Sequence, residues 1–203
     1  MGRSVGVLGG AFNPPHLAHM VLAQEAVARL GLDELILVPT GEAPHKRIDP
    51  EPGPAVRLEM AHLAVAREDL MRASDVEVSR EGPSFAYRTL ELIADELPGS
   101  DLTFVMGADV AAGLESWRRP ERVLELAGVA IAARPGFDMG GIDAVLDRLG
   151  ARGPARPIAM PELDVSSTMV RERVAAGLPI RWLVPDGVAG LIEERGIYAA
   201  ESQ

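Results

Sequence analysis

Residues 5–19, VGVLGGAFNPPHLAH, decide the fold, because they pass from an apolar run through a glycine turn into the start of an apolar-periodic segment. The run Val5–Leu8 favours a buried strand, and the segment Leu17–Leu30 has helical length. Gly9 and Gly10 allow a ligand to approach the backbone closely, and the free N–H groups of a helix start attract anions. We therefore expect a phosphorylated ligand at this turn.

Two histidines stand at the expected start of that helix. His16 and His19 are three residues apart, so both imidazoles project from one face near the first turn if Leu17 already lies in the helix. An isolated pair of this kind can also be two surface histidines near a helix start. The glycine turn and the two rings then face the same space, which makes both histidines candidates for phosphate chemistry.

The composition limits the classes of protein that the chain can represent. With 203 residues and no long polar spacer, residues 1–203 are expected to form one domain. No apolar run approaches the roughly 18 residues of a membrane span, and the N-terminus lacks the pattern of a signal peptide, so we expect a cytoplasmic protein without a membrane partner. The absence of cysteine excludes disulfides, cysteine nucleophiles and cysteine metal sites.

The net charge of −10 argues against a general nucleic-acid binder, which usually carries a basic patch. A small phosphorylated substrate needs only a local basic cluster. Three short clusters are available, at residues 45–47, 118–119 and 171–173.

Short apolar runs alternate with helix-length segments along the chain, which predicts an α/β fold with a doubly wound parallel sheet of the Rossmann-like type. The ligands of such folds bind at the carboxyl ends of the strands. A long loop rich in glycine, proline and charge is expected over Gly41–Pro54. The expected strands are 5–8, 35–38, 73–79, 102–106, 129–132 and 157–160, and the expected helices are 17–30, 57–67, 84–97, 121–126, 142–149, 169–176 and 188–194, with 142–149 on the surface.

The two common phosphate-loop patterns, G-x-G-x-x-G and G-x-x-x-x-G-K-[ST], are absent after the first expected strand, which disfavours a dehydrogenase or a P-loop NTPase. The sequence at that place, GGAFNPPHLAH over Gly9–His19, resembles the first signature of the nucleotidyltransferase superfamily that contains the H-x-G-H adenylyltransferases. Ala18 stands where that signature usually has glycine, so a small side chain is kept.

A second segment, Ser166–Arg171 (SSTMVR), resembles the S-S-T-x-x-R motif of the same family. It is a hydroxyl-rich helix start with an arginine one turn later, an arrangement that suits a triphosphate. An ordinary helix N-cap is the alternative for any single run of this kind. Two such helix starts at opposite ends of one α/β chain are much less expected by chance. The C-terminal helical part, about residues 165–203, carries this second motif.

Further matches resemble nicotinate-nucleotide adenylyltransferases in particular. Pro44-His45-Lys46 resembles their P-P-H-K, with Ala43 in place of the first proline, and Pro83-Ser84-Phe85 resembles their P-S-Y, with Ala86 where threonine is usual. Gly107-Ala108-Asp109, followed by Trp117, resembles their G-A-D segment and ring-stacking tryptophan. The matches run in the family's motif order from Gly6 to Tyr198.

The resemblance implies an enzyme of NAD biosynthesis that joins nicotinate mononucleotide and ATP to give nicotinate adenine dinucleotide and pyrophosphate. It implies catalytic roles for His16 and His19, and Mg²⁺ that enters with ATP without a dedicated protein ligand. The implied ATP-binding residues are Gly9, Gly10, Phe12, His16, His19, Ser167, Thr168 and Arg171. The implied mononucleotide-binding residues are Ala11, Lys46, Arg47, Ser84, Phe85, Ala86, Gly107, Asp109, Trp117 and Arg118.

Several alternatives stay open at this point. The acceptor could be nicotinamide mononucleotide or phosphopantetheine, or the chain could be a nucleotide-binding regulator without turnover. Taken singly, Lys46 and Arg47 could be solvated loop charges, Trp117 a core aromatic and Asp109 a helix N-cap. The sequence does not decide whether the protein forms a homo-oligomer.

Overall fold

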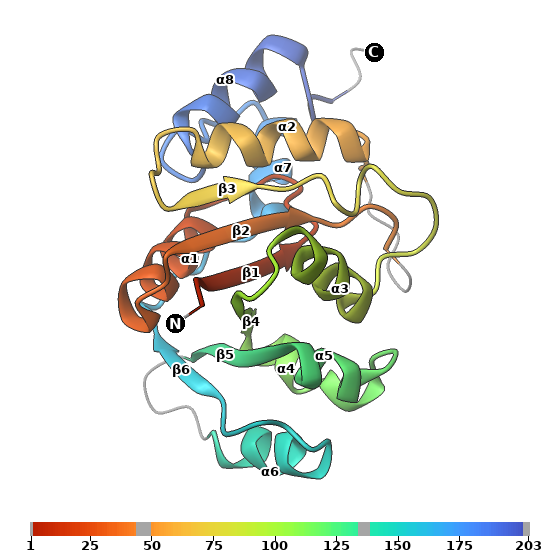
Figure 1. Cartoon of the computed structure of the whole chain (residues 1–203). Coiled ribbons are helices and arrows are strands. Elements are labelled where there is room, and N and C mark those ends of the chain that lie inside the picture. The colour runs from red at the N-terminus through yellow and green to blue at the C-terminus, as the bar shows by residue number, and fades with distance from the viewer. Residues whose placement is uncertain (1, 44–49, 134–138, 201–203) are drawn as a thin grey trace.

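The computed structural model describes residues 2–43, 50–133 and 139–200. Within these ranges six parallel strands form one sheet in the order β3-β2-β1-β4-β5-β6 (Figure 1), which is the doubly wound order of dinucleotide-binding folds. The strands are β1 (Ser4–Gly10), β2 (Glu34–Pro39), β3 (Met71–Ala73), β4 (Asp101–Gly107), β5 (Ala127–Ala133) and β6 (Arg156–Ala159).

The apolar strands of the sheet present alternate residues to two separate cores. On β2, Ile36 and Val38 join one cluster of buried residues, while Leu35 and Leu37 join the other. This alternation follows from the two-residue period of a strand. The strands are apolar along their length because helices cover both faces of the sheet.

The helices divide between the two faces (Figure 1). α1 (Leu17–Leu30) and α2 (Pro54–Val65) cover one face, and α3 (Ala86–Glu96), α5 (Pro120–Leu126) and α6 (Gly140–Arg148) cover the other. α7 (Ser167–Ala175) and α8 (Asp186–Arg195) pack with α2 around a third cluster. The short helix α4 (Ala108–Ala111) and the 3₁₀ helix η1 (Leu114–Ser116) follow β4.

The place where a ligand would bind follows from the strand order. β1 pairs with β2 on one side and with β4 on the other, so the chain winds in opposite directions from β1. The carboxyl ends of β1 and β4 therefore meet at the switch point of the sheet, which is where doubly wound folds bind their ligands. Gly9 and Gly10 end β1, and Gly107 ends β4.

One expectation about a single element is wrong. The strand expected over residues 73–79 is displaced, because β3 ends at Ala73 and residues 76–79 form a turn. Ser74 explains the early end, since its Oγ accepts a hydrogen bond from the Val76 N–H at 3.3 Å and so competes with strand pairing. α6 lies on the surface, as expected, and buries one face through Ile142 and Leu146.

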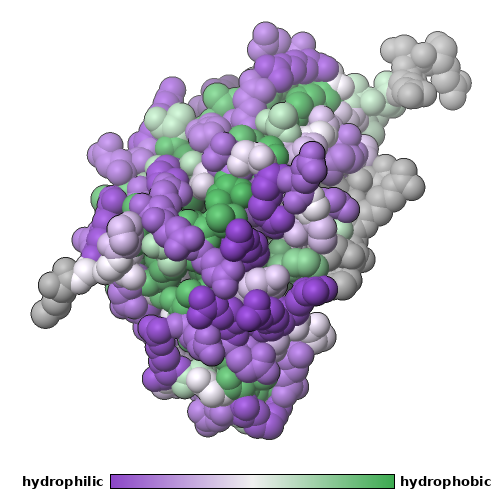
Figure 2. Space-filling view, turned by 45° about the vertical axis from the view of Figure 1, so that its right-hand side comes forward, coloured by the Kyte–Doolittle hydropathy of each residue, from purple (hydrophilic) through white to green (hydrophobic). Residues whose placement is uncertain are grey.

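Hydrophilic residues cover most of the face shown in Figure 2, with smaller hydrophobic patches between them. Across the described ranges, no helix combines the length and the apolar character that a membrane crossing needs.

Candidate active site

The histidine pair lies at the start of α1, as the spacing predicts. α1 begins at Leu17, and His16 is its N-cap residue in an extended conformation. The two imidazole centroids are 3.8 Å apart with an angle of 32° between the ring planes, and His16 is buried. The expectation that both rings share one face is therefore confirmed.

One hydrogen bond fixes the chemistry of the His19 ring. The backbone N–H of His16 donates to His19 Nδ1 at 3.2 Å, so Nδ1 acts as an acceptor and the neutral ring carries its proton on Nε2. The edge of His19 also meets the ring of Phe12, with centroids 5.0 Å apart. These contacts hold the ring in place and leave its Nε2–H as the group that can donate to a phosphate oxygen.

Burial keeps both imidazoles neutral. It lowers the pKa of His16 to about 4 and the pKa of His19 to about 3, and the neighbouring His16 adds to the shift of His19. At neutral pH the pair therefore acts through hydrogen bonds and not through full positive charges.

The turn between β1 and α1 is tightly folded. Phe12 has a φ of 47°, and the Asn13-Pro14 peptide bond is cis. Phe12, Asn13 and Pro14 are all buried. A Cβ atom at Gly10 would lie 3.3 Å from the Phe12 ring, a tight contact that would press on this ring.

The start of α7 packs directly on this turn. Ser167 Oγ donates to the carbonyl of Pro14 at 2.9 Å, and Arg171 Nη1 donates to the carbonyl of Asn13 at 2.9 Å. A second nitrogen of Arg171 bonds Thr168 Oγ1 at 3.2 Å. The two motifs at opposite ends of the sequence therefore lie side by side in the fold, with the hydroxyl-rich helix start next to the glycine turn.

Ser166 caps α7. Its side chain accepts a hydrogen bond from the Met169 N–H at 3.1 Å, which satisfies one of the free donors of the first turn. The N-cap reading of this segment is thus correct for Ser166, while Ser167 and Arg171 make contacts with the glycine turn that a cap alone does not require.

A second group of predicted residues lies around the start of α3. Ser84 Oγ accepts from the Gly41 N–H at 3.1 Å, and Phe85 is the N-cap residue of α3. The guanidinium of Arg118 lies over the Phe85 ring, 5.1 Å from its centroid. Trp117 is half-buried and meets the edge of Phe104, with ring centroids 5.9 Å apart.

Two further predicted residues, Asp109 and Ala86, lie at helix starts, and two others lie outside the described residues. Asp109 is exposed in the first turn of α4, and the N-cap residue of this helix is Gly107 and not Asp109. Ala86 is the first residue of α3. Lys46 and Arg47 lie outside the described residues, so their predicted contacts with phosphate stay predictions.

Sequence reasoning missed three residues that shape the site. Asn13 Oδ1 accepts from the hydroxyl of Tyr198 at 2.5 Å, and Asn13 Nδ2 donates to the carbonyl of Pro50 at 2.8 Å. Arg57 of α2 donates to the carbonyl of Ala11 at 2.9 Å. The signal for Arg57 was its place in the helix, because it shares the buried face with Met60, Ala61 and Ala64.

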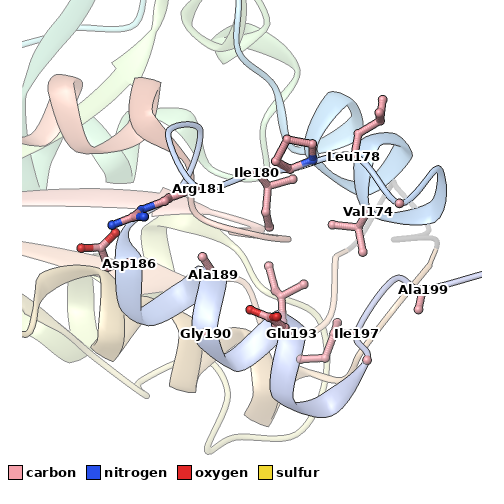
Figure 3. A pocket seen from close by; sticks show the side chains of 14 residues that line it. Val174, Leu178, Ile180, Arg181, Asp186, Ala189, Gly190, Glu193, Ile197 and Ala199 are labelled. Atoms are coloured by element: carbon pink, nitrogen blue, oxygen red, sulfur yellow. The ribbon is translucent and has the colours of Figure 1, made fainter.

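A cavity of about 790 Å³ lies elsewhere, between the end of α7 and α8 (Figure 3). Apolar residues such as Val174, Ile180 and Ile197 line it together with Arg181 and Glu193. None of the predicted site residues lines this cavity. The candidate active site is instead the surface at the carboxyl ends of β1 and β4.

Comparison with known proteins gives a family model and close relatives. Residues 7–173 match the family model described as cytidylyltransferase-like. A protein of Rubrobacter xylanophilus named "Probable nicotinate-nucleotide adenylyltransferase" is 36% identical over 98% of this chain and 94% of its own length. A protein of the same name from a Roseiflexus species is 40% identical over 96% of this chain and 97% of its own length.

Solved structures share the fold. The nicotinic acid mononucleotide adenylyltransferase of Plasmodium falciparum complexed with APC has a TM-score of 0.74 at 18% identity and covers 97% of both chains. The same enzyme complexed with NaAD has a TM-score of 0.72 at 19% identity, again over 97% of both chains.

The lowered histidine pKa values predict how stability depends on pH. The unfolded chain binds protons on His16 and His19 below about pH 6.5, while the folded chain does not until about pH 4 and 3. The unfolding free energy therefore decreases as the pH is lowered through this window, by about 1.4 kcal/mol per pH unit for each ring. Urea unfolding at pH 7.5 and 5.5 measures the fall.

The control is the double variant His16→Gln/His19→Gln, which keeps the other titrating groups. Between the two pH values the wild type should lose about 2 to 3 kcal/mol more than this variant. Equal losses in both proteins would contradict the assignment of neutral, buried imidazoles.

Proposed function

Because the chain belongs to the cytidylyltransferase-like family, and within it to the nicotinate-nucleotide adenylyltransferases, we propose that it joins nicotinate mononucleotide and ATP in NAD biosynthesis. The products are nicotinate adenine dinucleotide and pyrophosphate. Since ATP is a substrate, we place the enzyme in the cytoplasm.

The observation that carries this proposal is the meeting of two helix starts at one glycine turn. α1 presents the histidine pair, and α7 presents Ser167 and Arg171, which bond the carbonyls of Pro14 and Asn13. Both helix starts carry the partial positive charge of a helix N-terminus, which attracts phosphate oxygens. The arrangement fits a triphosphate that runs from α1 to α7.

The reaction needs no nucleophile from the protein. A phosphate oxygen of the mononucleotide attacks the α-phosphorus of ATP and forms the new P–O bond. The bond from the α-phosphorus to the bridging oxygen of the β-phosphate breaks, and pyrophosphate leaves with that electron pair. The protein contributes alignment of the two phosphates and stabilisation of the developing charge.

We assign the charge stabilisation to hydrogen bonds from the histidine pair. His19 Nε2–H is the available donor, because His19 Nδ1 already accepts from the His16 N–H. Ser167, Thr168 and Arg171 would hold the β- and γ-phosphates from the start of α7. Gly9, Gly10 and Phe12 would contribute backbone N–H groups or close contact at the turn.

The acceptor would lie toward α3 and η1. Trp117 offers a ring for stacking on the pyridine, and Asp109 is exposed for hydrogen bonds to ribose hydroxyls. Ala11, Ser84, Phe85, Ala86 and Gly107 complete this side of the site. The positive charge of Arg118, next to Trp117 and over Phe85, favours a carboxylate over an amide on the pyridine ring.

Mg²⁺ is expected to enter with ATP. The described residues contain no group of three or more His, Cys, Asp or Glu that could hold a metal ion. Phosphate oxygens and water would supply its ligands, as is usual for this ion, and it would neutralise part of the phosphate charge.

The substrate assignment is tested by pyrophosphate release. The wild-type enzyme is mixed with ATP and, in separate reactions, with nicotinate mononucleotide, nicotinamide mononucleotide and phosphopantetheine. The highest kcat/KM is expected for nicotinate mononucleotide, because Arg118 can pair with its carboxylate. A preference for the amide would contradict the substrate, and binding of ATP without release for any acceptor would indicate a regulator.

The role of His19 is tested by the variant His19→Ala. It should lower kcat, with a rise of about 2 to 4 kcal/mol in the activation free energy. The affinity for ATP should change much less, because the ring acts mainly in the transition state. Steady-state kinetics and ATP titration measure the two effects. His62→Ala, which removes an exposed histidine of α2, should keep wild-type kinetics. Near-normal turnover of His19→Ala would contradict the role.

A further inference from the structure

Arg57 of α2 is completely buried. Its exposed fraction is 0%, although it carries a guanidinium that is charged at any pH of interest. Burial of a charge is costly unless the charge is paired and hydrogen-bonded. The fold must therefore supply hydrogen-bond partners to the guanidinium of Arg57.

The guanidinium donates to three separate segments. Nη1 bonds the carbonyl of Ala11 at 2.9 Å, Nη2 bonds the carbonyl of Gly41 at 3.1 Å, and Nε bonds Glu51 Oε1 at 2.8 Å. The planar fork of an arginine suits this task, since its donors point in fixed and different directions. A single side chain thus ties the glycine turn to both ends of the segment between β2 and α2.

Two of these acceptors belong to the side of the site that we assign to the mononucleotide. Ala11 follows the glycine pair, and the Gly41 N–H bonds Oγ of Ser84. Through its bonds to the carbonyls of Ala11 and Gly41, Arg57 fixes the backbone at the two points on which this side of the site is built.

The third acceptor, Glu51, orients the arginine. Its Oε1 accepts from Arg57 Nε and also from the Gly53 N–H at 2.9 Å, directly before α2. The carbonyl of Gly53 in turn accepts a hydrogen bond from the backbone N–H of Arg57 at 3.1 Å. Glu51, which is bonded to the residue before α2, therefore fixes one side of the guanidinium, and the other nitrogens bond the carbonyls at the site.

Gly41 leaves little room for adjustment. A Cβ at this position would lie 2.5 Å from the backbone oxygen of Glu77, so the backbone of Gly41 is packed closely against that of Glu77. Loss of the Arg57 contact would leave the carbonyl of Gly41 without its side-chain donor at a place where the chain cannot easily move to find another.

We propose that Arg57 is a positioning residue for the acceptor mononucleotide: it fixes the backbone at Ala11 and Gly41 without touching the substrate. The inference rests on the proposed adenylyl transfer. It differs from a role in stability alone, because it predicts an effect that depends on which substrate is varied.

The test uses the variants Arg57→Lys and Glu51→Ala. Lysine keeps the charge but has no fork to bridge three acceptors, and Glu51→Ala removes the group that orients the guanidinium from a partly exposed position. Both variants should raise the KM for nicotinate mononucleotide and lower kcat/KM for it by roughly tenfold to a hundredfold, with a smaller change in the KM for ATP. The loss should be larger for Arg57→Lys.

The matched control is Arg195→Ala. Arg195 also pairs with a glutamate of α2, Glu59, but both partners are exposed and far from the turn in sequence. This variant should keep both KM values. The measurements are steady-state kinetics for each substrate and thermal unfolding of every variant.

The outcomes separate this inference from the proposed function. If the wild type does not transfer the adenylyl group, the proposed function fails. If the wild type is active and folded Arg57→Lys or Glu51→Ala keeps the wild-type KM for the mononucleotide, the inference is overturned. A fall in kcat and thermal stability with both KM values unchanged also overturns it, because that pattern belongs to a purely structural arginine.

Discussion

The fold and the site depend on one constraint: the turn between β1 and α1 cannot satisfy its own backbone carbonyls. Buried carbonyls need donors, and this turn is neither helix nor strand. Side chains from elsewhere supply them, with Arg57 at Ala11, Arg171 at Asn13 and Ser167 at Pro14. The residues that hold the turn therefore come from both halves of the chain, and the site forms only when the whole fold has formed.

The same constraint explains the chemistry that the site can offer. Because the turn is buried, the histidine pair is desolvated and neutral. The pair can therefore donate hydrogen bonds to a phosphate without carrying a full positive charge. Positive charge comes instead from Arg171, one turn into α7. This division suits a transfer between two phosphates, in which charge must be stabilised and no covalent bond to the protein is needed.

The sequence predicted the parts of the molecule that depend on local patterns. The helix over Leu17–Leu30 and the five longer strands follow from spacing and apolar runs. The family motifs predicted that the starts of α1 and α7 belong to one site. The contacts of Arg57 and Tyr198 depend on tertiary packing, which no local pattern shows. The strand near Ala73 was placed too late because Ser74 starts a turn that alternating valines conceal.

Direct transfer between the two substrates is the central claim, and the configuration at the α-phosphorus tests it most directly. ATP that carries a sulfur of known configuration on this phosphorus is allowed to react with nicotinate mononucleotide, and the configuration of the dinucleotide is then determined. A single in-line attack predicts inversion at phosphorus. Retention would contradict the account, because it requires two displacements and a covalent intermediate on the protein.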